Sequence, residues 1–208
     1  MQVILDISAN THQNDQRTIK KLIAAIPKTD RHNITLKTQL WSAKNPQGRN
    51  ARTTTKGLHT FMVAAKLAGY DATSSVFDRE SVLLLMKYKP KFVKIAFRDG
   101  LDMAAGAVCR DVPIYKSCDV EQDDWGSSWS KDKNMFCVPE YPAPVEKYYR
   151  MGHRGGVSDH SVGLHVWHMA MKDGFKCYEC HYVLERNYIN PDAGPFAKTP
   201  EDLREMFA

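Results

Sequence analysis

An α/β fold is predicted for this chain, namely a compact (β/α)8 TIM-type barrel with some reduced or missing helices. The first observation is that short β-branched runs alternate with amphipathic stretches, which is typical of parallel strands joined by helices. The second is that eight such runs occur, the number that closes into a barrel. The third is the length of 208 residues, which lies at the lower end of the roughly 200 to 250 residues such barrels need and so requires short connections.

The predicted strands are runs rich in β-branched and aromatic residues. They span residues 3–8, 34–41, 72–77, 92–96, 112–117, 135–139, 155–158 and 176–184. Apolar residues at helical spacing predict helices at residues 18–26, 58–67, 79–88, 101–108 and 162–171. Two polar segments interrupt the pattern, residues 44–56 and residues 119–134, and the second is expected to have lost its helix. We expect one domain over residues 1–208, because a chain of this size buries one substantial core.

Composition and charge exclude only a few classes of function. The formal net charge is +5, and no basic stretch is interleaved with aromatic residues, so nucleic acid is not an expected partner. A surplus of Lys and Arg suits an anionic substrate or simply a soluble surface. The N-terminus has no signal-peptide pattern and no run reaches membrane length, so we expect a cytoplasmic protein with no membrane partner. The five cysteines are then expected to be free thiols.

Two short segments near the end of the chain, residues 157–160 and 178–181, are each predicted as a strand ending in histidine. Neighbouring parallel strands lie about 4.8 Å apart, so His160 and His181 would meet at the carboxyl end of the sheet. The period of two places Ser158 on the side of His160 and Glu179 on the side of His181. Two imidazoles can hold one metal ion, so the pattern predicts a functional site.

Several motifs with a specific order and spacing on successive strand ends carry a family resemblance. They are KTQ (37–39), FDRES (77–81), KIA (94–96), YPAP (141–144), SDHSVG (158–163), ECH (179–181) and NPD (190–192). Through them the chain, from Ile4 to about Met206, resembles the N-acetylneuraminate (sialic acid) synthases and their relatives that make other nine-carbon nonulosonic acids.

The resemblance implies a metal-dependent condensation of phosphoenolpyruvate with an N-acylated amino sugar. By matching position, His160 and His181 would bind the divalent metal, most simply Mn2+, with Mg2+, Co2+ or Zn2+ as alternatives. The substrates would be its partners, and a homodimer is an assembly that the resemblance allows. Phosphoenolpyruvate would meet Lys37, Lys94, Ser75, Ser117 and Ser158, and the sugar would meet Gln39, Tyr141 and Asp192.

The expected catalytic carboxylates are Asp6, Asp99 and Glu179. Asp6 and Asp99 stand where the family has glutamates, and a retraction of about 1.5 Å can abolish a proton transfer that needs about 3 Å geometry. Either of these two aspartates could instead cap a helix, and Asp192 could merely initiate a turn.

The chain departs from the family pattern at further positions. Phe97 replaces a serine, Cys118 and Asp119 alter a Ser-Thr-Gly turn, and Cys180 replaces a lysine. The resemblance covers the barrel alone, without the C-terminal antifreeze-like domain that supplies an arginine to a partner's sugar site. The alternatives are therefore a weakened or non-catalytic relative that binds metal, sugar or phosphate, and a different metal-dependent aldolase or isomerase.

Residues 177–181 also match C-x-x-C-H, the attachment signature for c-type haem. In a strand, Cys177 and Cys180 would point to opposite faces and could not both reach one porphyrin. We therefore expect no haem.

Overall fold

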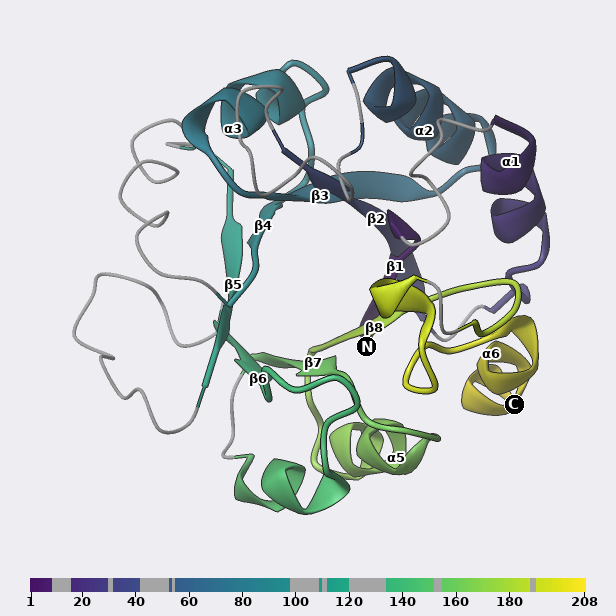
Figure 1. Ribbon diagram of the computed structural model, residues 1–208, viewed down its shortest axis with the longest axis vertical. Coiled ribbons are helices and arrows are strands. Elements are labelled where there is room, and N and C mark those ends of the chain that lie inside the picture. The colour runs from purple at the N-terminus through teal and green to yellow at the C-terminus, as the bar shows by residue number, and fades with distance from the viewer. Residues whose placement is uncertain are drawn as a thin grey trace.

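The computed structural model of the chain describes residues 1–8, 16–29, 32–41, 53, 55–97, 109, 112–119, 134–151, 155–187 and 190–208. Eight parallel strands close into a barrel in sequence order, β1-β2-β3-β4-β5-β6-β7-β8, with helices packed outside (Figure 1). The strands are β1 (Gln2–Asp6), β2 (Asn33–Leu40), β3 (Asp71–Val76), β4 (Val93–Ile95), β5 (Ile114–Cys118), β6 (Asn134–Cys137), β7 (Gly156–Asp159) and β8 (Cys177–His181). The predicted (β/α)8 barrel is confirmed.

The helices of the described residues flank the barrel. They are α1 (Gln16–Ala24), α2 (Thr55–Leu67), α3 (Arg79–Met86), α5 (His165–Lys172) and α6 (Pro200–Phe207), with 3-10 segments η4 (Val145–Arg150) and η5 (Pro191–Ala193). Among these residues, η4 is the helical segment between β6 and β7, so a 3-10 segment stands at this connection in place of an α-helix. None of these helices is long and apolar enough to cross a membrane.

Three predictions lie outside the described residues, wholly or mostly. They are the helix at 101–108 and the polar segments 44–56 and 119–134. Sequence reasoning missed α6, although Thr199 and Asp202 form a capping box and Pro200 stands at the first helical position. The predicted strand 176–184 was too long, because the chain leaves the barrel wall after His181 and Val183 N–H donates to Lys198 O at 2.9 Å.

Side chains along each strand point alternately to the outside and to the inside of the barrel. The outer side is apolar, and the inner side changes from apolar to polar along the strands. Outward side chains such as Val3, Leu36 and Val157 are buried in the main core with the helices. Inward positions begin with an apolar cluster formed by Ile4, Phe92, Met135 and Cys177, against which Tyr115 packs. Two residues further along these strands, the inward positions are polar or ionisable, for example Asp6, Lys94 and Glu179. The sequence therefore builds a dry floor and places its polar side chains above it.

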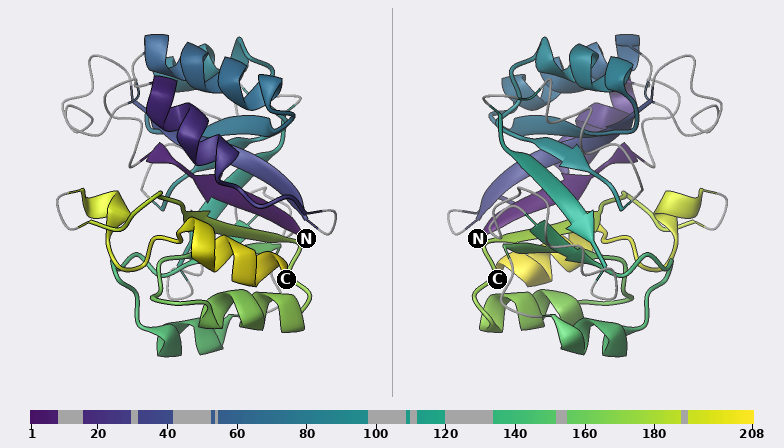
Figure 2. Two further views of the ribbon diagram at one scale, coloured as in Figure 1. Left: turned by 90° about the vertical axis from the view of Figure 1, so that its right-hand side faces the viewer. Right: turned by 90° about the vertical axis from the view of Figure 1, so that its left-hand side faces the viewer.

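Figure 2 shows both termini at the end of the barrel where the strands begin, with η5 at the opposite end. The carboxyl ends of all eight strands therefore lie on the same side as η5. In TIM-type barrels this face carries the chemistry.

Candidate active site

A cavity of about 190 Å3 opens at the carboxyl ends of the strands. It gathers every predicted site residue that the structure describes. These residues are Asp6, Lys37, Gln39, Ser75, Lys94, Ser117, Tyr141, Ser158, His160, Glu179, His181 and Asp192. Asp99, the remaining predicted site residue, lies outside the described residues.

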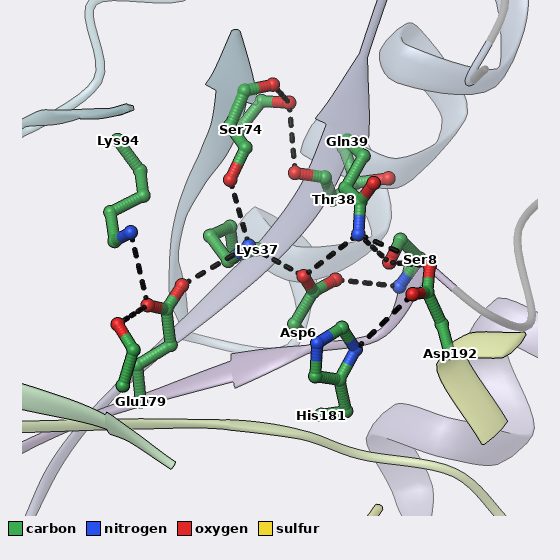
Figure 3. A network of polar contacts seen from close by, with 12 residues as sticks. Asp6, Ser8, Lys37, Thr38, Gln39, Ser74, Lys94, Glu179, His181 and Asp192 are labelled. Carbon is green, nitrogen blue, oxygen red and sulfur yellow. Dashed lines mark hydrogen bonds and ion pairs between the residues drawn. The ribbon is translucent and has the colours of Figure 1, made fainter. Parts of the chain in front are cut away.

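A row of alternating charges crosses the deep part of this cavity (Figure 3). Lys37 Nζ lies 2.5 Å from Asp6 Oδ2 and 3.1 Å from Glu179 Oε1, and Lys94 Nζ lies 3.1 Å from Glu179 Oε2. Ser158 Oγ donates to the same Glu179 Oε2 at 2.5 Å. All these side chains are buried, so each charge depends on its neighbours for compensation. We call Asp6, Lys37, Glu179 and Lys94 the ionic row.

Serine hydroxyls from neighbouring strands complete the coordination of the two lysines. Lys37 Nζ donates to Ser75 Oγ at 2.8 Å, and Lys94 Nζ donates to Ser117 Oγ at 2.6 Å. Ser117 Oγ in turn lies 2.9 Å from Ser158 Oγ. Short hydroxyl side chains leave space above the ammonium groups while still offering donors, as a binding site for an anion requires.

Three members of the ionic row, Asp6, Lys37 and Glu179, are held in their charged forms. Burial raises the pKa of Asp6 and of Glu179, but the lysine ammonium groups outweigh burial and hold both pKa values below their ordinary ranges. Burial lowers the pKa of Lys37, and the carboxylates of Asp6 and Glu179 more than reverse that effect. Asp6 and Glu179 are therefore carboxylates at neutral pH, able to accept a proton but holding none to donate.

The two predicted histidines lie above this row, one just after β7 and one at the end of β8. These strands pair in parallel, and the two ring centroids are 5.5 Å apart. His160 Nδ1 lies 2.9 Å from the Val138 carbonyl oxygen, which can only accept, so Nδ1 carries the proton and Nε2 keeps its lone pair. Burial and the neighbouring His181 lower the pKa of His160 to about 4, so the ring is neutral at pH 7.

His181 carries an unsatisfied ring nitrogen. Its Nδ1 is buried without a hydrogen-bond partner, and the Asp192 Oδ1 atom lies 4.0 Å away. Buried polar atoms of this kind call for a ligand, an ion or a small movement of a neighbour. No cluster of three or more His, Cys, Asp or Glu side chains suited to a metal occurs among the described residues. A divalent ion bound by His160 and His181 would therefore have to take its other ligands from substrate or water.

A hydrogen-bonded group lines the mouth of the cavity beside His181 (Figure 3). Gln39 Nε2 donates to Asp192 Oδ2 at 3.1 Å and to Ser8 Oγ at 3.0 Å, and it lies 3.4 Å from Asp6 Oδ2. Asn190 fixes the η5 turn because its side-chain oxygen accepts from the Asp192 backbone N–H at 3.0 Å. The mouth therefore presents an amide and a carboxylate, which suit hydroxyl groups of a polar substrate.

Aromatic rings form the opposite rim. The Tyr141 ring lies 4.1 Å, centroid to centroid, from that of His160 and remains 55% exposed. Phe196 contacts Tyr141 and lies 5.3 Å from the His181 ring centroid. These rings shield the histidine pair from water on one side.

The C-terminal part of the barrel, which supplies the histidines, the rim and η5, matches a known family. Residues 134–208 match the model of the NeuB family. Over these residues the barrel is similar to the NeuB family. No curated protein matches the chain.

Solved structures share the fold of this NeuB-like barrel along nearly its whole length. N-acetylneuraminic acid (sialic acid) synthetase from Leptospira borgpetersenii serovar Hardjo-bovis, in complex with citrate, has 18% identity and a TM-score of 0.75, over 99% of this chain and 80% of that one. Spore coat polysaccharide biosynthesis protein spsE from Bacillus subtilis has 20% identity and a TM-score of 0.73, over 99% and 65%. A truncated 3-deoxy-D-arabino-heptulosonate 7-phosphate synthase from Thermotoga maritima has 13% identity and a TM-score of 0.65, over 99% and 85%.

Some residues of the NeuB-like site were missed by sequence reasoning. Ser8, which hydrogen-bonds Gln39, and Phe196, which packs on the rim, had no motif of their own. Cys137 lines the cavity with its Sγ 3.9 Å from His160 Nδ1, and burial raises the pKa of its thiol to about 12. The strand period could have placed Cys137 inward, because it follows Met135 by two residues on β6 and Met135 faces the interior.

Two of the departures from the family pattern, Phe97 and Cys180, lie in different parts of the barrel. Phe97 lines the cavity, so its ring occupies part of the site that a serine would leave open. Cys180 is part of the outer core, whereas Cys177 belongs to the inner apolar cluster. The two thiols of the C-x-x-C-H pattern therefore lie on opposite faces of β8, as the strand geometry predicts.

Proposed function

We propose that this NeuB-like barrel condenses phosphoenolpyruvate with an N-acylated amino sugar, giving a nonulosonic acid and phosphate. Carbon 3 of phosphoenolpyruvate would form a bond with the aldehyde carbon of the open-chain sugar. Water would add at carbon 2, and the bond between carbon 2 and the phosphate oxygen would break. One water molecule is consumed and one phosphate is released for each sugar, so the reaction needs no oxidant or reductant.

The observation that carries the proposal is the position of the histidine pair above two buried lysines in one cavity. A divalent ion held by His160 and His181 would polarise the aldehyde oxygen and would add positive charge to a site whose lysines already have carboxylate partners. Few structural roles explain buried lysines and an unsatisfied histidine nitrogen at the reactive end of a barrel.

The ionic row and its serines support an anionic first substrate. Lys37 and Lys94 hold fixed positions, each with a hydroxyl within 2.8 Å of its ammonium nitrogen. A phosphate or carboxylate group entering above them would find ammonium and hydroxyl donors already oriented, so little ordering cost would remain at binding. The dry apolar floor below the row excludes water from the far side.

The mouth supports a sugar as the second substrate. Gln39 and Asp192 offer a donor amide and an acceptor carboxylate, and Tyr141 offers a ring face and a hydroxyl. Asp6 and Glu179 would keep Lys37 charged. Asp99 remains a predicted acid or base outside the described residues.

Phosphate release from phosphoenolpyruvate, measured with Mn2+ across a panel of N-acyl amino sugars, tests the proposal. We expect release that requires a sugar and falls at least about a hundredfold in Lys94→Met, because one anion contact is lost in the transition state. Lys91→Met is the matched control, since Lys91 lies on the same segment with its side chain 66% exposed. Release without any sugar, or full activity of Lys94→Met, would contradict the proposal.

A second candidate function is a barrel that binds the same ligands without turning them over. The lining of the cavity by Phe97 and the pairing of both lysines with carboxylates favour it, because both features weaken a phosphate site. Binding of Mn2+ and phosphoenolpyruvate by calorimetry, with no phosphate released with any sugar of the panel, would select this candidate.

A further inference from the structure

A second buried polar cluster lies outside the barrel wall, behind the two histidines. Lys198 and Asp159 are both fully buried, and Lys198 Nζ lies 3.1 Å from Asp159 Oδ2. Asp159 points outward from β7, because the flanking residues Ser158 and His160 both line the cavity. This ion pair therefore lies on the outer side of the barrel wall and has no direct access to a substrate.

The cluster is completely satisfied. Lys198 Nζ also donates to the Ser161 carbonyl at 2.9 Å and to the Gly163 carbonyl at 2.7 Å, which uses all three ammonium protons. Asp159 Oδ1 accepts from both the backbone N–H and the hydroxyl of Ser161, at 2.7 and 2.6 Å. Asp159 Oδ2 accepts from the Tyr178 hydroxyl at 2.5 Å. A network this saturated permits a single arrangement of the chain segments that supply it.

Those segments are the ones that carry the histidines. Asp159 and Ser161 flank His160 directly in the chain. On the other side, the Lys198 backbone N–H donates to the His181 carbonyl at 2.8 Å. One lysine thus binds the turn after His160 with its side chain and the end of β8 at His181 with its backbone.

Stability alone is a poor explanation for this arrangement. Burying an ion pair removes two charges from water, and well-packed apolar residues of the same volume are often equally stabilising or better. A buried pair that is no aid to stability can still select one conformation among several. The geometry selected here is the separation of 5.5 Å between the two imidazole centroids.

We propose that Lys198, through Asp159, is the positioning residue that sets the distance and orientation of His160 relative to His181. The inference rests on the proposed function in one respect, namely that the histidine pair holds a divalent ion. Lys198 itself touches neither ion nor substrate.

The test compares the wild-type chain with the double variant Asp159→Asn/Lys198→Met, in which no unpaired charge is left buried. Co2+ binding by calorimetry and the visible absorption spectrum of the Co2+-loaded protein report the geometry of the site, which a purely structural role would leave unchanged. We expect the folded double variant to bind Co2+ about 10- to 100-fold more weakly, as for other residues that orient metal ligands, and to show a shifted spectrum. Lys147→Met is the control, because Lys147 forms an exposed ion pair with Glu140.

Co2+ affinity and spectrum identical to the wild type in the double variant would overturn the inference. If the wild-type chain binds no Co2+, the metal part of the proposed function fails, and the crystal structure of the double variant decides the positioning claim. A change of more than about 0.5 Å in the separation of the two rings supports that claim, and a smaller change overturns it.

Discussion

Lys37 shows how single residues determine the chemistry of this barrel. An isolated ammonium group in a protein interior is strongly disfavoured, yet Lys37 is buried between two strands. Its neighbours remove the penalty, because register places Asp6 beside it on β1 and Glu179 lies within 3.1 Å. The same neighbours raise the pKa of Lys37, so the site keeps a permanent positive charge.

Because of the ionic row, we expect the free energy of unfolding to depend on pH in the acid range. The carboxylate of Asp6 has a pKa below its ordinary range in the folded chain, so the unfolded chain binds more protons in the window below about pH 4. The stabilisation by Asp6 is present above that window and is lost as the pH falls through the folded pKa. Urea unfolding across pH 5 to about 2 should therefore show the advantage of wild type over Asp6→Asn shrinking as the pH falls. An advantage that stays constant with pH would contradict this linkage.

The histidine pair should control ion binding. We expect His160→Ala and His181→Ala each to weaken Mn2+ binding by at least roughly tenfold, because each removes a ligand from a site with only two. Isothermal titration calorimetry measures the affinity, and His168→Ala, a change on the exposed face of α5, provides the control. Affinity unchanged in both cavity variants would rule out the metal site.

Residues of the site were predictable where local geometry alone decides their position. The period of two within a strand placed Ser158 with His160 and Glu179 with His181, and all four line the cavity. Lys198 was not predictable, because its partners Asp159 and Gly163 become neighbours only after the barrel has closed. The same holds for Phe196, whose place on the rim depends on the path of the chain after β8.

At the scale of elements, the pairing of β7 with β8 brings the histidine-bearing ends together. Gly156 begins β7 opposite Cys177, and a Cβ at Gly156 would lie 2.9 Å from the Cys177 carbonyl oxygen. Backbone atoms cannot rotate away as a side chain can. The absence of a side chain at Gly156 therefore permits the close approach of the two strands.

Gly156→Ala should force these strands apart. We expect a loss of about 1–3 kcal/mol in the free energy of unfolding, measured by urea denaturation, together with weaker Mn2+ binding, because the histidines stand on the displaced strands. Gly174→Ala is the control: its φ of 70° makes the change strained, but a Cβ there meets nothing within 4 Å. Gly174→Ala should lower stability without altering ion affinity. Equal effects of both changes on Mn2+ binding would contradict the argument.

Elements were predicted well where the apolar period is strong, and their bounds were less certain. All eight strands were found, because each is a short β-branched run between polar segments. The strand predicted at 112–117 begins two residues later, at Ile114, since Pro113 has no N–H to donate to a neighbouring strand. The helix α6 was missed because it is only eight residues long and follows a segment without a regular apolar period.

At the scale of the whole molecule, barrel closure brings side chains from all parts of the sequence together in one cavity. Asp6 and Asp192 stand near opposite ends of the chain, yet Gln39 hydrogen-bonds Asp192 and lies within 3.4 Å of Asp6. The site residues that the resemblance predicts, where the structure describes them, line this one cavity. What the resemblance could not supply is the pairing of both lysines through a single carboxylate, that of Glu179.

An anion that binds this cavity should stabilise the whole barrel. Phosphate at about 100 times its dissociation constant would add about 2.7 kcal/mol by mass action, so the melting temperature should rise. Lys94→Met should abolish the rise, whereas Lys91→Met should retain it because Lys91 lies on the surface. Differential scanning fluorimetry over a phosphate titration measures both. A rise that persists unchanged in Lys94→Met would show that the anion binds elsewhere.

The central claim is that the paired histidines hold a divalent ion above the ionic row. Anomalous diffraction at the manganese absorption edge, from crystals grown with Mn2+, tests it most directly. The account predicts one strong peak within about 2.0–2.3 Å of a ring nitrogen of His160 and of a ring nitrogen of His181. Crystals grown with saturating Mn2+ that show no peak between the two imidazoles would contradict it.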